Sequence, residues 1–314
     1  MRLDTVITNY IAYRRALGER FITEANRLKS FCHAIGGETE LSDILPEQVN
    51  SFIRGTGPIT LTWHAKYDAL AGLYHYALSR GLATASPLPT IKPPRVTSFV
   101  PYIYTHEELR RLLAAALTYQ TRRRFIDPYM VQTLLLLVYG AALRISEALS
   151  LRLADVDLKQ AVLTIRDSKF FTSRLVPIGS LLNERLQQYA ALRHQTGAAQ
   201  TDDAPFFVKN NGQGVTTDNV EHVFPLIRRK AGISRTDGGR LQPRVHDLRH
   251  TFAVHRLTSW YREGKDVQKL LPHLSVFLGH RHLAYTSVYL TMTPELLTQA
   301  SKRFEQYALK GGDL

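Results

Sequence analysis

The sequence predicts a two-domain, mainly α-helical protein whose second domain also carries a small antiparallel β-sheet, an α+β fold. At 314 residues the chain exceeds the range that one hydrophobic core usually organises. Apolar residues recur at helical spacing along most of it, whereas two short segments on either side of residue 170 alternate as β-strands do. We therefore expect a helical domain over residues 1–84, a linker over residues 85–104, and a second domain over residues 105–314 that ends in a C-terminal helix.

The net charge is strongly basic and favours a polyanionic partner. The chain has 40 Lys and Arg against 27 Asp and Glu, a formal net charge of +13. Residues 1–100 hold 11 basic and 8 acidic residues, so +10 of this charge lies in residues 101–314. Such an excess is typical of nucleic-acid-binding domains, and a solvated basic surface without a ligand is the alternative.

Features of secreted or membrane proteins are not expected. The single cysteine, Cys32, excludes an intramolecular disulfide framework and a multi-cysteine zinc site. The N-terminus lacks the basic and continuously apolar regions of a signal peptide, and the apolar stretch 129–143 is too short and interrupted to span a bilayer. We expect a soluble, cytoplasmic protein with no membrane partner.

Four helices are expected in the first domain, at about residues 3–17, 21–34, from Pro46 onward, and 61–78. The polar side of the fourth helix carries three residues that suit contact with DNA, since a helix fits the major groove. An ordinary solvated helix face explains them equally well. The three candidates are His64, Lys66 and Tyr67.

The linker is predicted from its composition. Five prolines favour an extended connector over a helix: Pro87, Pro89, Pro93, Pro94 and Pro101. Basic residues in this connector are candidates for contact with DNA phosphates, and they are Lys92 and Arg95.

The second domain is expected to begin with a capped helix over residues 106–118. Thr105 and Glu108 stand at the spacing of a capping box. Residues 127–142 predict a strongly apolar helix at the domain centre. Further helices are expected at 217–230, 246–263, 266–278, 283–291 and 295–309.

A β-hairpin is predicted between the helices of the second domain. Residues 161–165 and 174–178 alternate in the manner of strands, and the loop between them holds Lys169. Residues 205–208 are a candidate third strand. A lysine at a hairpin tip is commonly no more than solvated.

Cationic and imidazole side chains gather on one face of the helix expected at 246–263. His246, Arg249 and His250 are spaced i, i+3 and i+4, so in a helix they converge on a single anion. Gly279-His280 ends the next predicted helix, and Tyr289 follows nine residues later. This spacing gives a phenol a route back to the same anion.

Arg144 follows the small residues of Tyr139-Gly140-Ala141-Ala142, which let a guanidinium group approach backbone and ligand. Its planar fork suits phosphate, and Glu147, one turn further on, is placed to orient it. A surface ion pair is the competing interpretation.

These residues together supply what phosphoryl transfer in DNA needs without a metal: a nucleophile, cations for the charge of the phosphorane, and an acid for the leaving oxygen. Metal ligation is disfavoured, because no cysteine or well-placed carboxylate completes a zinc ligand set near His246 and His250. Asp247 is expected to point off their face. Nucleotide-binding fingerprints are absent, and we expect no metal and no other cofactor.

The order of these motifs resembles the tyrosine recombinases, also called phage integrases. The resemblance covers about residues 105–310, and the N-terminal helical region resembles the core-binding domain of the family. It implies a catalytic domain over 105–314 and site-specific recombination of DNA, for integration, excision or resolution of an element. The matching motifs are Gly-Ala-Ala-Leu-Arg144-Ile-Ser-Glu, Lys169 in a hairpin, His246-x-x-Arg249-His250, Gly279-His280 and Tyr289.

The resemblance implies that Tyr289 is the nucleophile. It attacks the scissile phosphate to give a 3′-phosphotyrosyl link and a free 5′-hydroxyl, and a 5′-hydroxyl of a partner strand reverses the step without ATP. Tyr285 and Tyr261 compete for the role, but the family spacing from Gly-His favours Tyr289.

The remaining roles are likewise implied by the resemblance. Arg144 and Arg249 hold the non-bridging oxygens of the phosphate, and His280 donates a hydrogen bond to one of them. Lys169 protonates the leaving 5′-oxygen, and His246 assists proton transfer from the tyrosine. Glu147 and His250 are implied as residues that support these groups.

The implied partners are double-stranded DNA recombination sites and further copies of the recombinase. A homotetramer, or a hetero-oligomer with related recombinases, is expected on paired sites. The segment between His250 and Gly279 is longer than in compact members and resembles recombinases of transposons or integrated elements. Two alternatives stay open: a DNA-binding architectural protein of the same fold without chemistry, and a type IB topoisomerase-like enzyme that relaxes DNA alone.

Overall fold

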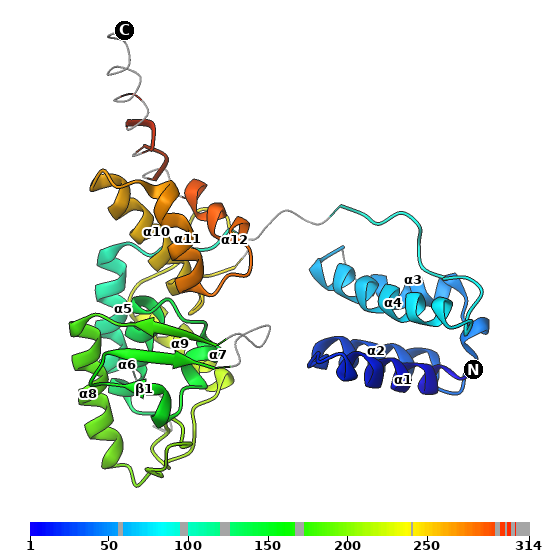
Figure 1. The fold of residues 1–314 in the computed structure, drawn as a ribbon, viewed down its shortest axis with the longest axis horizontal. Coiled ribbons are helices and arrows are strands. Elements are labelled where there is room, and N and C mark those ends of the chain that lie inside the picture. Colours follow the sequence, from blue (N-terminus) through cyan, green and yellow to red (C-terminus); the bar gives the residue numbers. More distant parts are fainter. Residues whose placement is uncertain are drawn as a thin grey trace. The chain divides into compact units, whose positions relative to one another are not determined.

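The structure, a computed structural model, describes residues 1–55, 59–94, 100–119, 126–166, 173–239, 241–292, 296–298, 300–302 and 305. The chain divides into two compact units, Met1–Phe99 and Val100–Leu314, shown in Figure 1. Each unit has a hydrophobic core of its own. Two predicted site residues, Arg95 and Lys169, lie outside the described residues.

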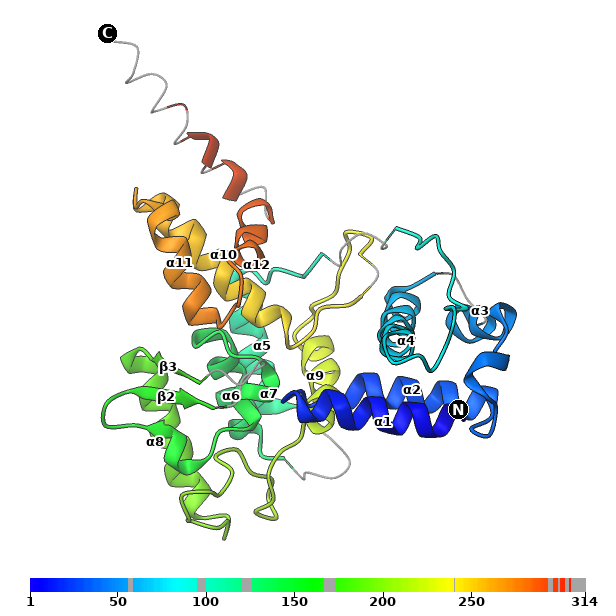
Figure 2. The same ribbon diagram turned by 45° about the vertical axis from the view of Figure 1, so that its right-hand side comes forward.

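The first unit is a bundle of α-helices, as the apolar spacing predicted. Completely buried leucines line its interior, among them Leu3, Leu28 and Leu73. α1 and α2 run beside each other, and α4 packs against both of them, as Figure 2 shows. The elements are α1 (Leu3–Ala16), α2 (Ile22–Ile35), the 3₁₀ turn η1 (Leu41–Asp43), α3 (Pro46–Arg54) and α4 (Leu61–Ser79).

The second unit is mostly helical with one three-stranded antiparallel sheet of order β1-β2-β3, which confirms the predicted fold class. Its helices are α5 (His106–Thr118), α6 (Pro128–Gly140), α7 (Ile145–Leu149), α8 (Ser180–His194), α9 (Thr217–Lys230), α10 (Asp247–Arg262), α11 (Val267–Leu278) and α12 (Ala284–Ser287). The strands and short turns are η2 (Leu153–Asp155), β1 (Val156–Asp157), β2 (Val162–Ile165), β3 (Arg174–Pro177) and η3 (Val288–Thr291).

The predicted hairpin is confirmed, but the third strand is not the predicted one. β2 and β3 pair antiparallel, with Leu163 opposite Val176, and both side chains are buried. The strand that completes the sheet is β1. The prediction of a strand at residues 205–208 was wrong: successive Phe206 and Phe207 are both buried against Tyr189 and do not alternate between two faces.

α8 was not predicted from the sequence. Only three of its fifteen residues are buried, and one of them is charged, so apolar periodicity is faint along it. The three buried residues are Leu186, Tyr189 and Arg193.

The start of α10 is held by the segment that leads into α5. The backbone N–H of Tyr104 donates to the Thr251 hydroxyl at 3.0 Å, and the Tyr104 hydroxyl donates to the carbonyl of Arg244 at 3.2 Å. The predicted capping box of α5 is present, since the Glu108 N–H lies 3.1 Å from Thr105 Oγ1 and the Thr105 N–H lies 2.8 Å from the Glu108 carboxylate. Since α10 also packs on the buried α6, these contacts fix the helix that carries His246, Arg249 and His250.

Candidate active site

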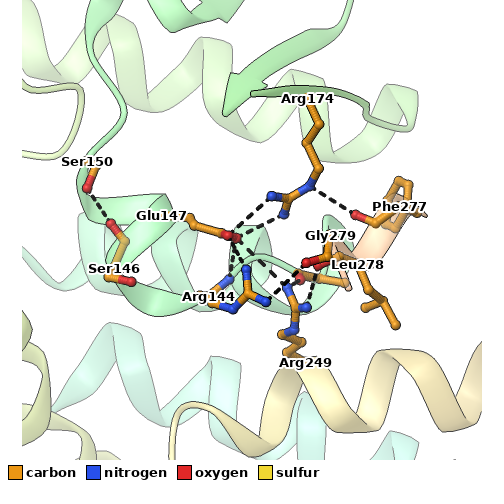
Figure 3. A network of polar contacts seen from close by, with 10 residues as sticks. Arg144, Ser146, Glu147, Ser150, Arg174, Arg249, Phe277, Leu278 and Gly279 are labelled. Carbon is orange, nitrogen blue, oxygen red and sulfur yellow. Dashed lines mark hydrogen bonds and ion pairs between the residues drawn. The ribbon is translucent and has the colours of Figure 1, made fainter. Parts of the chain in front are cut away.

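Glu147 lies at the centre of the candidate site, surrounded by three arginines (Figure 3). Arg144 donates to its Oε1 at 2.5 Å through Nη1, and to its Oε2 at 3.0 Å through the backbone N–H. Arg174 donates to both oxygens, at 3.2 Å and 2.9 Å. Arg249 Nη1 lies 3.8 Å from Oε2. The side chain of Glu147 is therefore placed to orient Arg144, as the sequence suggested. It also binds a second arginine, Arg174, which was not predicted from the sequence.

The charge of this cluster keeps Glu147 ionised. Burial alone would raise the pKa of its carboxyl group, but the hydrogen bonds and charge of Arg174, with those of Arg144, outweigh burial and lower the pKa to about 2. Burial, reinforced by the charge of Arg144, lowers the pKa of Arg249 to about 10, so its guanidinium remains charged at neutral pH. The cluster thus holds three positive charges against one negative charge.

The backbone on either side of the cluster is shaped to meet these arginines. α6 ends at Gly140, earlier than predicted, and Ala142 adopts a positive φ of 52°. Arg249 Nη1 donates to the carbonyl of Ala142 at 2.6 Å. Gly279 ends α11 with a φ of 65°, and a Cβ atom there would lie 2.7 Å from Arg174 Nη1, so both conformation and space require glycine.

Tyr289 lies beside this cluster in the same chain. Its hydroxyl oxygen is 2.8 Å from His250 Nδ1, and its ring stacks on that of His280 with centroids 6.2 Å apart. The side chain is almost fully buried. Burial raises the pKa of the phenol, while the charges of Arg249 and Arg144 act in the opposite direction and favour the phenolate.

Three histidines around the tyrosine are neutral at neutral pH. Burial, together with nearby positive charge, lowers the pKa of His246, His250 and His280 to about 4 each. His280 Nδ1 is bonded to the Thr286 hydroxyl at 2.8 Å, which leaves Nε2 as the ring nitrogen for a ligand. The ring of His246 contacts that of His250 edge-on, with centroids 4.8 Å apart.

The structure therefore brings together most of the predicted site residues, from segments far apart in sequence. The proton-transfer partner expected from the resemblance was His246, but the histidine bonded to the Tyr289 hydroxyl is His250. The residues that meet are Arg144, Glu147, His246, Arg249, His250, His280 and Tyr289. Arg174 had one usable signal: in β3 it stands two residues before the buried Val176 and so shares the inward face, an unusual place for an arginine.

The competing tyrosine Tyr285 and the carboxylate of Asp247 have surroundings different from those of Tyr289. Tyr285 is largely exposed, and its ring lies edge-on to those of His282 and His280, with centroids 5.6 Å and 6.3 Å apart. Asp247 is buried and accepts hydrogen bonds from the backbone and side chain of Arg244. Among the residues that the structure describes, no cluster of three or more His, Cys, Asp or Glu is suited to hold a metal ion.

The candidate DNA contacts of the first unit need one correction. His64 is buried, so the prediction that it lies on the polar side of its helix was wrong: its ring packs against Trp63 inside the bundle. Lys66 donates to the carbonyl of Phe52 at 2.7 Å, and the Tyr67 hydroxyl donates to the carbonyl of Pro89 at 3.2 Å. Lys92 pairs with Asp68 and lies over the Tyr67 ring.

No helix in the described part of the chain is long and apolar enough to cross a membrane.

Comparisons of sequence and of fold with known proteins point to the same family. The Phage integrase family matches residues 103–295. A Sinorhizobium fredii protein named as an integrase/recombinase, y4rB, is 34% identical over 316 residues that cover 96% of each chain. The tyrosine recombinase XerA of Thermococcus kodakarensis is 30% identical over 217 residues, which cover 68% of this chain and 66% of XerA.

Solved structures share the fold. The Tn1549 transposon integrase in complex with transposon right end DNA matches with a TM-score of 0.70 at 16% identity, covering 98% of this chain and all of that one. A lambda integrase dimer bound to a core site matches with a TM-score of 0.66 at 15% identity, covering 90% of this chain and 96% of that one. The chain belongs to the phage integrase family, the tyrosine-type site-specific recombinases.

Proposed function

We propose that this recombinase cuts and rejoins DNA strands through a 3′-phosphotyrosyl intermediate formed by Tyr289. The observation that carries the proposal is the position of the Tyr289 hydroxyl, 2.8 Å from a neutral imidazole and beside an arginine cluster with excess positive charge. A phenol is a weak nucleophile at its ordinary pKa of about 10, and such surroundings favour removal of its proton at the moment of attack.

The proposed strand cleavage requires no cofactor. The phenolic oxygen of Tyr289 forms a bond to phosphorus as the bond to the 5′-oxygen breaks. His250 accepts the phenolic proton, and Lys169 gives a proton to the leaving 5′-oxygen. Because one phosphodiester replaces another, the return attack by a 5′-hydroxyl of a partner strand needs no external energy.

The phosphate itself is bound by the remaining residues. Arg144 and Arg249 neutralise its non-bridging oxygens through their guanidinium groups, and Nε2 of His280 donates a hydrogen bond to one of them. Nδ1 of His280 lies 2.8 Å from the Thr286 hydroxyl, and in the tautomer that this role requires the hydroxyl donates to Nδ1 while Nε2 carries the proton. His246 contributes through its contact with the ring of His250.

The partner of this reaction is a pair of double-stranded recombination sites. The Tn1549 and lambda integrases, whose fold this chain shares, are seen bound to transposon end and core-site DNA. We assign integration, excision or resolution of a DNA element to this chain, acting as a tetramer on paired sites. Lys66, Tyr67, Lys92 and Arg95 are the proposed contacts of the first unit and linker with DNA.

Trapping of the covalent intermediate tests this proposal. A nicked duplex carrying a site selected for binding to the protein loses its short 5′-hydroxyl fragment after cleavage, so the adduct accumulates and survives denaturation. We expect an adduct with the wild-type protein, none with Tyr289→Phe, and a normal yield with Tyr285→Phe, a matched tyrosine four residues away. An adduct that persists in Tyr289→Phe would overturn the assignment of the nucleophile.

Adduct trapping, combined with assays of plasmid relaxation and of strand exchange, separates the two alternatives. A bound site without adduct in the wild type would favour a DNA-binding protein without chemistry. An adduct together with relaxation of supercoiled plasmid by monomers, and without strand exchange between two sites, would favour a topoisomerase-like activity.

A further inference from the structure

The carboxyl end of α11 meets all three arginines of the site. Gly279 and His280 close the helix by donating their N–H groups to the carbonyls of Val276 and Ser275, at 2.9 Å and 3.0 Å. The next three carbonyls lie beyond the reach of the helix's own donors. Arg174 Nε donates to Phe277 at 3.3 Å, Arg249 Nη2 donates to Leu278, and Arg144 Nη2 donates to Gly279 at 3.2 Å, as Figure 3 shows.

Arg174 is the member that joins this helix end to Glu147. Its two Nη atoms hold both carboxylate oxygens of Glu147, while its Nε holds the carbonyl of Phe277. One planar fork thus spans β3, α7 and α11. A guanidinium suits this task because its donors lie in a fixed plane, whereas an ammonium group offers one point of charge.

The surroundings of Arg174 suit a residue that holds other groups of the protein in place, and not one that binds substrate. Its side chain is 11% exposed, against 26% for Arg144. Its guanidinium packs so closely on Gly279 that a Cβ atom would lie 2.7 Å from Nη1 and 2.9 Å from Cζ. All three of its nitrogen atoms are engaged by Glu147 and Phe277, which uses three of its five N–H donors within the protein.

We propose that Arg174 is a positioning residue for strand cleavage, which sets Arg144 through Glu147 and sets His280 through the end of α11. The proposal rests on the phosphotyrosyl reaction proposed above. Glu147 has about four acceptor positions, and Arg174 fills two of them. Without Arg174 the carboxylate keeps its hydrogen bonds to the backbone N–H and to the guanidinium of Arg144 only, so Glu147 and the Arg144 guanidinium are held less firmly. His280 follows Gly279 directly, so movement of this helix end displaces the imidazole from the phosphate.

The test compares Arg174→Met and Arg174→Lys with the wild type on the nicked DNA substrate, measuring DNA affinity and single-turnover cleavage separately. We expect affinity close to that of the wild type and cleavage slowed roughly 10- to 100-fold in Arg174→Met, the scale that misplacement of reacting groups produces. Arg174→Lys keeps the charge and loses the fork, so its rate should lie between the two.

A spectroscopic readout separates positioning from general loss of structure. Burial lowers the pKa of His280, and the charges of Arg249, Arg144 and Arg174 lower it further. In Arg174→Met the pKa of His280, followed by NMR titration of its imidazole, should therefore rise, whereas in Arg174→Lys it should stay nearer the wild-type value. The matched control is Arg193→Met, which removes another buried arginine and should change neither the titration nor the rate.

The outcomes are distinguishable. Wild-type protein that binds the site and forms no adduct would refute the phosphotyrosyl reaction, whatever the variants do. A wild-type adduct with unchanged rates in both Arg174 variants would overturn the positioning role. Parallel loss of affinity and rate would make Arg174 a DNA contact, and failure of both variants to fold while Arg193→Met folds would make it a purely structural residue; either result overturns the proposal.

Discussion

Among the buried arginine side chains of the second unit, those at two places are satisfied differently. Arg193, 1% exposed, donates only to neutral acceptors: the carbonyls of Pro205 and Ala199 and the side-chain oxygen of Gln200. At Glu147, three guanidinium groups share one carboxylate and the carbonyls at the end of α11. The first arrangement fastens a loop with one arginine. The second places more positive charge together than is required to hold a loop in position.

The difference identifies which arrangement is made for a ligand. Arginines held among carbonyls need no partner from outside once their donors are used. The cluster at Glu147 keeps two more positive than negative charges in a poorly solvated place, which is costly until an anion joins it. Arg144, the most exposed of the three, gives that anion access. An excess of buried charge, more than burial itself, supports the assignment of this cluster as the proposed phosphate site.

Removal of the one negative charge should have the largest effect on stability. Glu147→Gln leaves three cations without a counter-charge and faces an amide N–H₂ toward arginine donors. Since Glu147 is buried, we expect a loss of about 3–5 kcal/mol in the free energy of unfolding, measured by chemical denaturation. Glu184→Gln, on the exposed face of α8, is the matched control. Equal stabilities of the two variants would contradict the excess of charge inferred here.

Removal of Arg193, a buried arginine outside the site, should lower the free energy of unfolding less than Glu147→Gln does, and it should leave strand cleavage unchanged. Arg193→Met leaves the carbonyls of Pro205 and Ala199 without their donor, a loss of about 1–3 kcal/mol in the free energy of unfolding. Strand cleavage at a temperature where the variant is folded should match the wild type. If Arg193→Met were fully stable and cleaved DNA more slowly, the inference that only the cluster at Glu147 serves a ligand would be wrong.

Acid should destabilise the site in two successive ranges. In the folded protein the pKa of His246, His250 and His280 is lowered to about 4, whereas it is about 6.5 in the unfolded chain. The unfolded state therefore binds more protons between these values. As the pH falls from about 6.5 to about 4, the free energy of unfolding decreases by on the order of 1 kcal/mol for each histidine. Glu147, with a pKa of about 2, adds a loss between about pH 4.5 and pH 2.

Thermal unfolding at pH 7 and pH 5 measures the first range. We expect a lower midpoint temperature at pH 5. His255, whose pKa burial also lowers to about 4, provides a comparison outside the site. His255→Asn should reduce the difference between the two pH values by about the share of one histidine, and a midpoint that is equal or higher at pH 5 would argue against neutral, buried imidazoles.

The smallest effect on stability is expected at an exposed pair. Lys92 and Asp68 are both more than a third exposed, with side chains at 35% and 46%. Lys92→Met should change the free energy of unfolding by less than about 0.5 kcal/mol. If Lys92 contacts DNA phosphate as proposed, the slope of log affinity against log salt should become shallower by about 1. An unchanged slope would remove Lys92 from the DNA contacts.

Local rules were enough to predict much of the fold. The capping box at Thr105, the helix stop at Gly279 and the pairing of residues 161–165 with 174–178 depend on residues near one another in the chain, and all three are present. Where a residue's environment is set by other elements, prediction failed. His64 was predicted on the polar side of its helix and is buried in the bundle. Residues 205–208 were predicted as a strand and make only isolated β-bridges among the described residues.

The sequence alone determined most of the chemical groups that the site contains, Arg174 excepted, and which of them share a helix face, because i, i+3 and i+4 spacing is a property of any α-helix. The tertiary structure decided which groups touch. His250 and not His246 meets the Tyr289 hydroxyl across 39 residues of sequence, and Arg174 reaches Glu147 across 27. Such contacts depend on how β3, α7, α10, α11 and η3 pack, and no periodicity within a single segment encodes that.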